Sequence, residues 1–272
     1  MIFTQTFGTR EGMPTVLAHC FLGHSGSWKR MLDALPVGLD ALAFDMPGHG
    51  RSPMPAAPGD FHAMVSGQIG GLVVRPSLLV GHSFGAASML RHALLHPETV
   101  TGMVLIEPVF FAAARAEPEF PAYEASEQAL RHAVAAGDLD EAARCFLALN
   151  EGSPDFDTLP APVRESMAAQ MPLVVATTEG LFGDSGGLLA PGVMTGFDKP
   201  VLLMRGAQTS PIFHATVRAL ARLLPRAEVA VIEGAGHMVP ISHPVQTADA
   251  IAAWMQRAGL AADGQTEKPR VV

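Results

Sequence analysis

One serine of this chain has surroundings that suit covalent chemistry. Ser83 lies in the sequence Gly81-His82-Ser83-Phe84-Gly85, after an apolar run and before several small residues. This order predicts a strand, a sharp turn and a helix, and the two glycines leave room for a turn that exposes one hydroxyl at the edge of a sheet. Unpaired amides at the start of that helix favour negative charge. We therefore predict that Ser83 is a nucleophile.

A serine hydroxyl is a weak nucleophile at neutral pH and needs a base within hydrogen-bonding reach. The chain has 11 histidines, and most are expected to be core or surface residues. His237 differs because it lies in a glycine-rich loop just after the last predicted strand. Histidine has an ordinary pKa of about 6.5, so it can take the proton from serine and return it to a leaving group. His237 is the predicted base.

Three other histidines could suggest different roles. His82 is next to the nucleophile, and its side chain is expected to point away from it. His92 and His96 are four residues apart on one predicted helix, a spacing that could suit a metal. No third ligand is evident, so we predict that this pair is solvated and that the chain has no metal site.

The elements around these residues alternate between strands and helices. Apolar runs predict strands at 2–7, 15–19, 41–45, 78–82, 100–106, 200–206 and 228–232. Helical patterns follow at 27–35, 61–74, 84–96, 214–224 and 244–257. This alternation predicts an α/β fold with a mostly parallel, doubly wound sheet whose strand ends carry the function.

The alternation breaks between residues 110 and 197. This segment contains helical patterns at 124–136, 139–149 and 163–177, separated by joints rich in proline and glycine. We therefore expect a helical cap at 110–197 that lies over the strand ends. The core is then formed by residues 1–109 and 198–260, and the polar, unpatterned residues 261–272 are predicted to be a flexible tail.

Four motifs in this order resemble the α/β-hydrolase family: His19-x-Phe21-x-Gly23, Asp45-x-Pro47-Gly48-x-Gly50-x-Ser52, Gly81-x-Ser83-x-Gly85 and Gly236-His237. The resemblance covers nearly the whole chain outside the expected cap, and a Gly-x-Ser-x-Gly between strand and helix is its most specific part. It implies a sheet of about eight strands and a serine hydrolase that requires no metal or organic cofactor.

The acid of the triad departs from the commonest pattern of the family. The usual carboxylate follows the strand at 200–206, but Thr209 occupies that position and no Asp or Glu occurs from 199 to 227. Some members of the family resemble this chain in placing the acid after the strand that follows the nucleophile strand, and here that residue is Glu107. Adjacent strand ends lie about 4.8 Å apart, so Glu107 could reach His237. Asp45, or a dyad without an acid, stays open as an alternative.

The resemblance also implies an oxyanion hole made by the backbone N–H groups of Phe21 and Phe84. Cys20 stands where the family often has glycine. A cysteine nucleophile at this position is a sharper interpretation, but Cys20 has no tight turn comparable to that of Ser83, so we predict a packing role for it.

Four residues are expected to line a substrate pocket: His24, Trp28, Phe110 and Phe111. Packing within a helix explains Trp28 equally well. Three methionines of the expected cap are predicted to be packing residues, although flexible thioethers also suit an adaptable apolar pocket; they are Met167, Met171 and Met194.

Composition excludes several classes of partner. The formal net charge of -8 argues against nucleic acid and anionic membranes. No apolar run reaches the roughly 18 residues of a membrane span, and we find no secretory signal. Two cysteines cannot form a disulfide framework. We expect a cytoplasmic protein whose partner is a small apolar acyl or ester substrate, and the sequence leaves its oligomeric state unknown.

The predicted function is therefore hydrolysis of a carboxylic ester or related acyl compound, through a Ser83–His237–Glu107 triad and an acyl-enzyme. Carbon–carbon bond hydrolysis or perhydrolysis on the same triad is one alternative, because a fold and a triad do not determine the substrate. A non-catalytic small-molecule receptor on the same scaffold is another.

Overall fold

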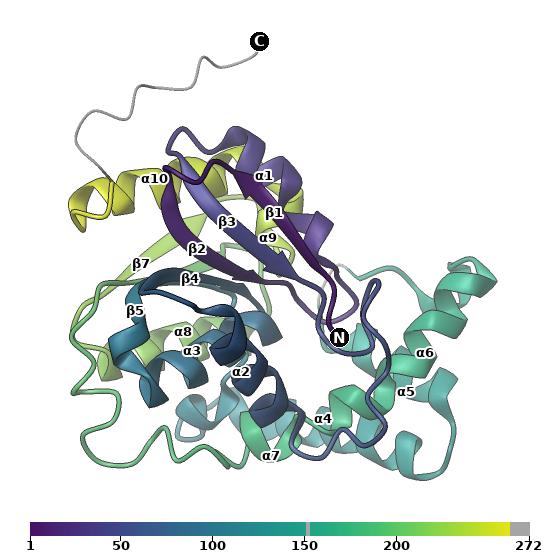
Figure 1. Cartoon of the computed structure of the whole chain (residues 1–272). Helices are drawn as coiled ribbons and strands as arrows, with labels where there is room; N and C mark the ends of the chain where they lie inside the picture. Colours follow the sequence, from purple (N-terminus) through teal and green to yellow (C-terminus); the bar gives the residue numbers. More distant parts are fainter. Residues whose placement is uncertain (151–152, 262–272) are drawn as a thin grey trace.

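The structure is a computed structural model that describes residues 1–150 and 153–261, and one seven-stranded sheet lies at its centre (Figure 1). The strand order is β1-β3-β2-β4-β5-β6-β7. β1 runs antiparallel to β3, and all other neighbouring pairs are parallel. The strands are β1 (Thr4–Gly8), β2 (Met13–Ala18), β3 (Leu39–Phe44), β4 (Ser77–His82), β5 (Val100–Ile106), β6 (Val201–Gly206) and β7 (Ala227–Ile232). The predicted mostly parallel sheet is confirmed, with seven strands described where about eight were expected.

Helices cover both faces of the sheet (Figure 1). One face packs against α2 (Phe61–Leu72), α3 (Phe84–Leu95) and α8 (Pro211–Leu223). The other face packs against α1 (Lys29–Ala34), α9 (Val239–Ser242) and α10 (Pro244–Arg257). This doubly wound arrangement follows from the alternation of strands and helices along the chain.

The central strands are apolar on both faces. Along β5, Met103 and Leu105 pack into the first of these layers, whereas Val104 and Ile106 pack into the second. All six residues of β4 are buried as well. Continuous apolar runs of this kind are typical of parallel strands covered by helices on both sides.

A helical segment, residues 108–200, is inserted between β5 and β6; we call it the insertion. Its helices are α4 (Phe120–Ala135), α5 (Leu139–Ala148), α6 (Ala161–Val175) and α7 (Thr178–Leu181), with short 3-10 helices η3 (Phe111–Ala114) and η4 (Phe156–Thr158). None of its described residues is in a strand. A small apolar cluster of its own, which includes Ala142, Phe156 and Met171, holds α4, α5 and α6 together. Figure 1 shows these three helices beyond the end of the sheet toward which β2 and β3 run.

Each predicted helix is present, most of them with shifted ends, whereas the short helices α7, α9, η3 and η4 were not predicted. The helix expected at 27–35 is divided into a 3-10 turn, η1 (Ser25–Trp28), and α1. A further 3-10 turn, η2 (Pro97–Thr99), precedes β5. The tail expected at 261–272 lies outside the described residues except for Ala261. Within the described part of the chain, no helix is both long enough and apolar enough to cross a membrane.

Candidate active site

Ser83 lies at the turn between β4 and α3, in a backbone conformation that L-residues rarely adopt. Its φ is 57° and its ψ is -117°. The turn is held because the N–H of Ser83 donates to the carbonyl of Ile106 over 2.8 Å, which extends the pairing of β4 with β5. Strain that is maintained by surrounding structure is typical of functional sites. The predicted strand, turn and helix around this serine are thus present.

The two flanking glycines are required by close backbone contacts. A Cβ on Gly81 would lie 2.5 Å from the Cα of Ala86, and one on Gly85 would lie 2.2 Å from the carbonyl oxygen of Ala18. Neither distance is compatible with a side chain. The motif therefore allows α3 to pack directly against the end of β2, and this contact aims the serine hydroxyl away from the sheet.

His237 reaches Ser83 from the loop that follows β7. Its Nε2 lies 2.9 Å from Oγ of Ser83, and its Nδ1 lies 3.1 Å from Oε2 of Glu107. Because a carboxylate only accepts hydrogen bonds, Nδ1 carries the ring proton and Nε2 accepts from the serine. Phe213 of α8 packs on the imidazole, with 4.4 Å between the ring centroids. The three side chains therefore form one hydrogen-bonded chain, as base catalysis requires.

Glu107 is fully buried at the end of β5, and three donors hold its carboxylate. The N–H of Gly206 donates to Oε1 over 2.6 Å, and the hydroxyl of Thr209 donates to Oε2 over 2.8 Å. His237 is the third donor. A buried carboxylate without such partners would be strongly unfavourable. Gly206 and Thr209 come from the end of β6 and His237 comes from the loop after β7, so the carboxylate is held in one orientation from two strand ends.

Thr209 is a site residue that sequence reasoning treated only as a missing acid. It occupies the loop after β6 and donates to the same carboxylate oxygen that His237 contacts. The signal was present in the sequence, because a hydroxyl at the usual acid position can complement a carboxylate that comes from the neighbouring strand.

His82 is the second residue whose contribution sequence reasoning missed. As expected it points away from Ser83, but its Nε2 donates to the backbone carbonyl of His237 over 2.9 Å. Burial, followed by the nearby His237, lowers the pKa of His82 to about 3. His82 is thus a neutral donor that holds the loop of His237 against the end of β4.

Phe21 and Phe84 line the same cavity as Ser83, and their N–H groups make no hydrogen bond with another described residue. The loop that carries Phe21 is tied down by His19, whose Nε2 accepts from the N–H of Met46 over 3.0 Å and whose Nδ1 donates to the carbonyl of Cys20 over 2.7 Å. Burial lowers the pKa of His19 to about 3, so the ring stays neutral and keeps this donor–acceptor pattern.

Asp45 does not take the place of the acid. Its carboxylate accepts from the N–H of Ser25 over 2.6 Å and from the N–H of Arg51 over 2.8 Å. Burial raises the pKa of Asp45, but these hydrogen bonds outweigh burial and hold the pKa below its usual value. Asp45 therefore links the loops after β2 and β3. In this structure His237 contacts Glu107 and not Asp45.

Cys20 lines the cavity beside Ser83 but is poorly suited to nucleophilic attack. Burial raises the pKa of its thiol to about 12, so the reactive thiolate is not formed near neutral pH. The packing role predicted for this cysteine agrees with its burial.

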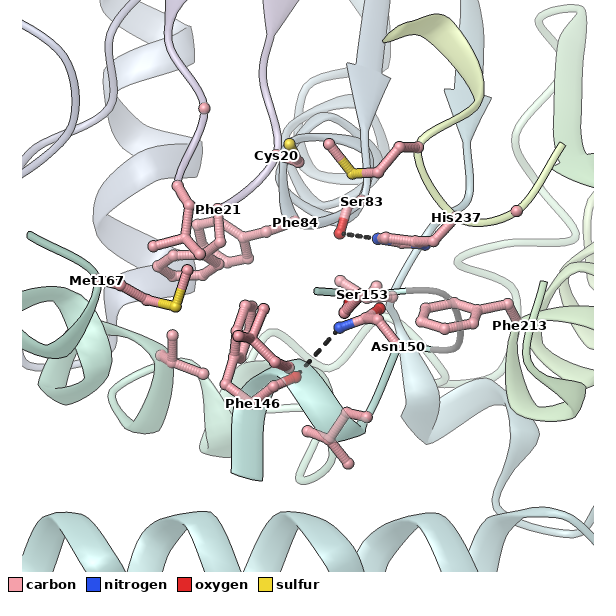
Figure 2. A pocket seen from close by; sticks show the side chains of 18 of the residues that line it. Cys20, Phe21, Ser83, Phe84, Phe146, Asn150, Ser153, Met167, Phe213 and His237 are labelled. Carbon is pink, nitrogen blue, oxygen red and sulfur yellow. Dashed lines mark hydrogen bonds between the residues drawn. The ribbon is translucent and has the colours of Figure 1, made fainter. Parts of the chain in front are cut away.

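A cavity of about 940 Å³ opens in front of Ser83, between the strand ends and the insertion. Figure 2 shows Ser83 and His237 on one side and Asn150 and Ser153 facing them from the insertion. Most of the wall is apolar, with contributions from Phe21, Phe84, Val109, Leu130, Phe146, Leu147, Leu159, Met167, Val174, Leu181, Phe182 and Ile241.

Two of the four expected pocket residues line this cavity. They are His24 and Phe111. Trp28 does not line it, because the 3-10 turn η1 directs its side chain into the layer of α1 and α10. Phe110 does not line it either; it is fully buried in the layer of α2, α3 and α8. Both expectations are corrected for the same reason, since adjacent positions in a turn point in different directions.

The remaining candidate residues are placed as follows. Among the predicted packing methionines, Met167 lines the cavity, whereas Met171 and Met194 do not. His92 is buried rather than solvated, and its Nε2 lies 3.1 Å from the hydroxyl of Thr99. Across residues 1–150 and 153–261, no group of three or more potential metal-ligating side chains is present.

Comparison with known proteins identifies the class of protein to which this fold belongs. A family model described as the alpha/beta hydrolase family matches residues 15–250, and the chain belongs to this family. It is therefore an α/β-fold hydrolase.

Individual relatives and solved structures agree with this class. The pimeloyl-[acyl-carrier protein] methyl ester esterase of Methylococcus capsulatus is 29% identical over 244 residues, which cover 88% of this chain and 82% of the relative. An esterase structure from Thermogutta terrifontis superimposes with a TM-score of 0.65 at 20% identity, over 94% of this chain and 93% of that one. A loop variant of a haloalkane dehalogenase from Bradyrhizobium elkanii has a TM-score of 0.70 at 20% identity, with the same coverage. At this identity the two structures support the fold alone.

Proposed function

We propose that this α/β-fold hydrolase cleaves carboxylic esters through a triad of Ser83, His237 and Glu107. The observation that carries the proposal is the continuous hydrogen-bonded chain from Oγ of Ser83 through both imidazole nitrogens to Oε2 of Glu107, with distances of 2.9 and 3.1 Å. A relative that covers 88% of this chain is named for hydrolysis of a methyl ester, which supports an ester substrate.

In the first half of the reaction, Oγ of Ser83 attacks the ester carbonyl carbon while its proton moves to Nε2 of His237. The negative charge that develops on the carbonyl oxygen is held by the N–H groups of Phe21 and Phe84. Glu107 stabilises the imidazolium and keeps the proton on Nδ1. The C–O bond to the alcohol then breaks, and the alcohol leaves with the proton from Nε2.

In the second half, water replaces the alcohol. His237 takes a proton from this water as its oxygen attacks the acyl carbon, and the same two N–H groups hold the oxyanion. Collapse of the intermediate breaks the acyl–Oγ bond, and Nε2 returns its proton to Ser83. Every proton transfer passes through Nε2 of His237, and no cofactor is needed.

Residues 110–197 are proposed to act as a cap on this site. The cavity is lined both by strand-end residues and by residues of α4, α5 and α6, so a substrate chain would lie between the two parts. Because most of this wall is apolar, the cap is expected to select small apolar acyl or ester substrates by the size and shape of their chains.

The proposal is tested by turnover of p-nitrophenyl esters of increasing acyl chain length, with Ser83→Ala as the matched variant. We expect turnover by the parent protein and none by Ser83→Ala, whose circular dichroism spectrum and melting temperature should resemble those of the parent. Labelling of the parent by a fluorophosphonate, lost in Ser83→Ala, would identify the nucleophile. If Ser83 resists this probe and all esters, while a ligand still raises the melting temperature, the chain is a receptor and not an esterase.

A further inference from the structure

Two polar side chains interrupt the apolar wall of the cavity. Tyr123 and Glu127 both line it, together with Leu130. All three belong to α4, where residues three and four positions apart lie on the same face. Because this face looks into the cavity, the hydroxyl and the carboxyl are neighbours within one part of the wall.

The ring of Tyr123 is held by three aromatic side chains. It lies 4.6 Å from Phe111, 6.2 Å from Phe182 and 6.2 Å from Phe213, measured between ring centroids. Phe213 in turn packs on His237. The tyrosine is therefore rigidly placed two ring contacts from the catalytic base, within reach of a chain that extends from the ester carbonyl.

The hydroxyl of Tyr123 has no hydrogen-bond partner among residues 1–150 and 153–261, and the two donors to Glu127 are Arg131 and Thr178. Burial, with a smaller contribution from Glu127, raises the pKa of this hydroxyl, so it stays protonated and can donate. Tyr123 is half-buried, and a tyrosine hydroxyl within a mostly apolar wall normally has a partner. A donor in the cavity wall without one is a position at which a ligand atom can supply the missing acceptor.

Glu127 supplies acceptors beside this donor. Its side chain is only 8% exposed, and it accepts from Nε of Arg131 over 2.8 Å and from the hydroxyl of Thr178 over 2.9 Å. Each carboxyl oxygen can accept a second hydrogen bond. Arg131 does not line the cavity, so a ligand that reaches this position meets the carboxyl group and not the guanidinium.

We propose that Tyr123 and Glu127 form a subsite for an alcohol hydroxyl carried on the apolar chain of the ester substrate. A hydroxyl is the small neutral group that can accept from tyrosine and donate to a carboxyl at the same time. A plain hydrocarbon chain would leave the tyrosine unpaired, and a chain ending in a carboxylate would be desolvated beside Glu127. This inference rests on the proposed function, because it assigns the substrate class of the same site.

The test compares p-nitrophenyl esters of ω-hydroxyalkanoic acids with plain alkanoate esters of matched length. In the parent protein, kcat/KM for the hydroxy ester should exceed that for its plain counterpart at one chain length. In Tyr123→Phe, this ratio should fall about fivefold or more, as expected for one lost hydrogen bond. Ser126→Ala is the matched control, since it removes a hydroxyl from the exposed side of α4 and should keep the parent ratio.

A binding measurement keeps this result separate from the esterase proposal. Calorimetry on Ser83→Ala, with the N-methyl amides of the same acids, measures the preference for the hydroxyl without turnover. Preference in binding without any ester turnover would overturn the proposed function and support the subsite. Equal ratios in Tyr123→Phe and the parent at every chain length, or a preference for an ω-carboxylate, would overturn the subsite.

Discussion

At the scale of single residues, the site depends on one carboxylate that accepts three hydrogen bonds from two strand ends. Glu107 accepts from Gly206, Thr209 and His237, and His237 accepts from Ser83. The imidazole is also fixed from behind, through its own carbonyl, by His82. Orientation of this kind is what a base needs to work in one tautomer. Replacing one hydrogen-bonding partner at a time should therefore show which groups orient the imidazole and which mainly stabilise the fold.

Glu107→Gln is expected to lower kcat by about 10³–10⁴, because an amide can donate to the imidazole and favour the wrong tautomer. Ester kinetics would measure this loss. Asp45→Asn is the comparison, since Asp45 binds backbone N–H groups elsewhere and should mainly lower the free energy of unfolding, by about 2 kcal/mol. Near-full activity in Glu107→Gln would show that the acid is assigned incorrectly.

Thr209→Val should lower kcat by about tenfold with little change in KM, because the carboxylate loses a donor that touches no substrate. Thr209→Ser should restore most of the rate, since it restores the hydroxyl. Thr101→Val is the matched control: the hydroxyl of Thr101 is buried in the structure without a partner, so its removal should leave kcat unchanged. A parent-like kcat in Thr209→Val would mean that this hydroxyl does not position Glu107.

At the scale of elements, the site exists because parallel strands end at one edge. Ser83 follows β4, Glu107 follows β5, Thr209 follows β6 and His237 follows β7. These four strands are consecutive neighbours in the sheet, so residues up to 154 positions apart in sequence meet. Close packing of α3 against the end of β2 constrains the turn that carries Ser83.

Gly85→Ala should destabilise the fold by at least about 2 kcal/mol and abolish activity, because the added Cβ would overlap the carbonyl of Ala18. Gly67→Ala is the opposite case. Gly67 is exposed within α2 and its Cβ would meet nothing within 4 Å, so the substitution should stabilise the fold by about 0.5–1 kcal/mol. Urea unfolding measures the free energy of unfolding of both variants. Equal changes in the two variants would contradict this prediction.

At the scale of the whole molecule, the interior contains an unusual number of neutral histidines. Burial is the largest cause of each lowered pKa, which reaches about 3 for His19 and His82 and about 4 for His49, His62 and His92. His19 and His82 form hydrogen bonds between different strand-end loops, and His49 forms one within its own loop. His62 forms a hydrogen bond with the carbonyl of Ala87 in α3. The fold around the site therefore depends on these rings remaining uncharged.

Stability should consequently fall as the pH falls below about 6.5. The unfolded chain binds protons at the ordinary histidine pKa, whereas the folded chain does not until about pH 3–4. Each such histidine contributes about 1.4 kcal/mol of lost stability per pH unit in this window. Against a typical free energy of unfolding of about 5–15 kcal/mol, five of them predict acid unfolding near pH 5.

Urea titrations at several pH values between 7.5 and 4.5 would measure this slope. His49→Gln removes one of these titrating groups, so the free energy of unfolding should change by about 1.4 kcal/mol less per pH unit than in the parent. This difference is expected whatever the effect of the substitution on stability at pH 7.5. A free energy of unfolding that changes by less than about 1.4 kcal/mol between pH 6 and pH 5 would contradict the prediction.

The sequence by itself determined the order of the elements and the residues at their ends. Local patterns were sufficient for this, because apolar runs predict buried strands and Gly-x-Ser-x-Gly predicts a turn that only small neighbours allow. The absence of an acid between residues 199 and 227 directed attention to Glu107, which the structure brings to His237. These features depend on residues close together in the chain.

Only the tertiary structure decided which way side chains point once distant loops meet. It directed Trp28 and Phe110 into the packed layers, joined Thr209 to Glu107, and set His82 against the carbonyl of His237. It also turned one face of α4 into a cavity wall. The physical reason is that these contacts join residues more than fifty positions apart, or depend on turn geometry that periodicity does not encode.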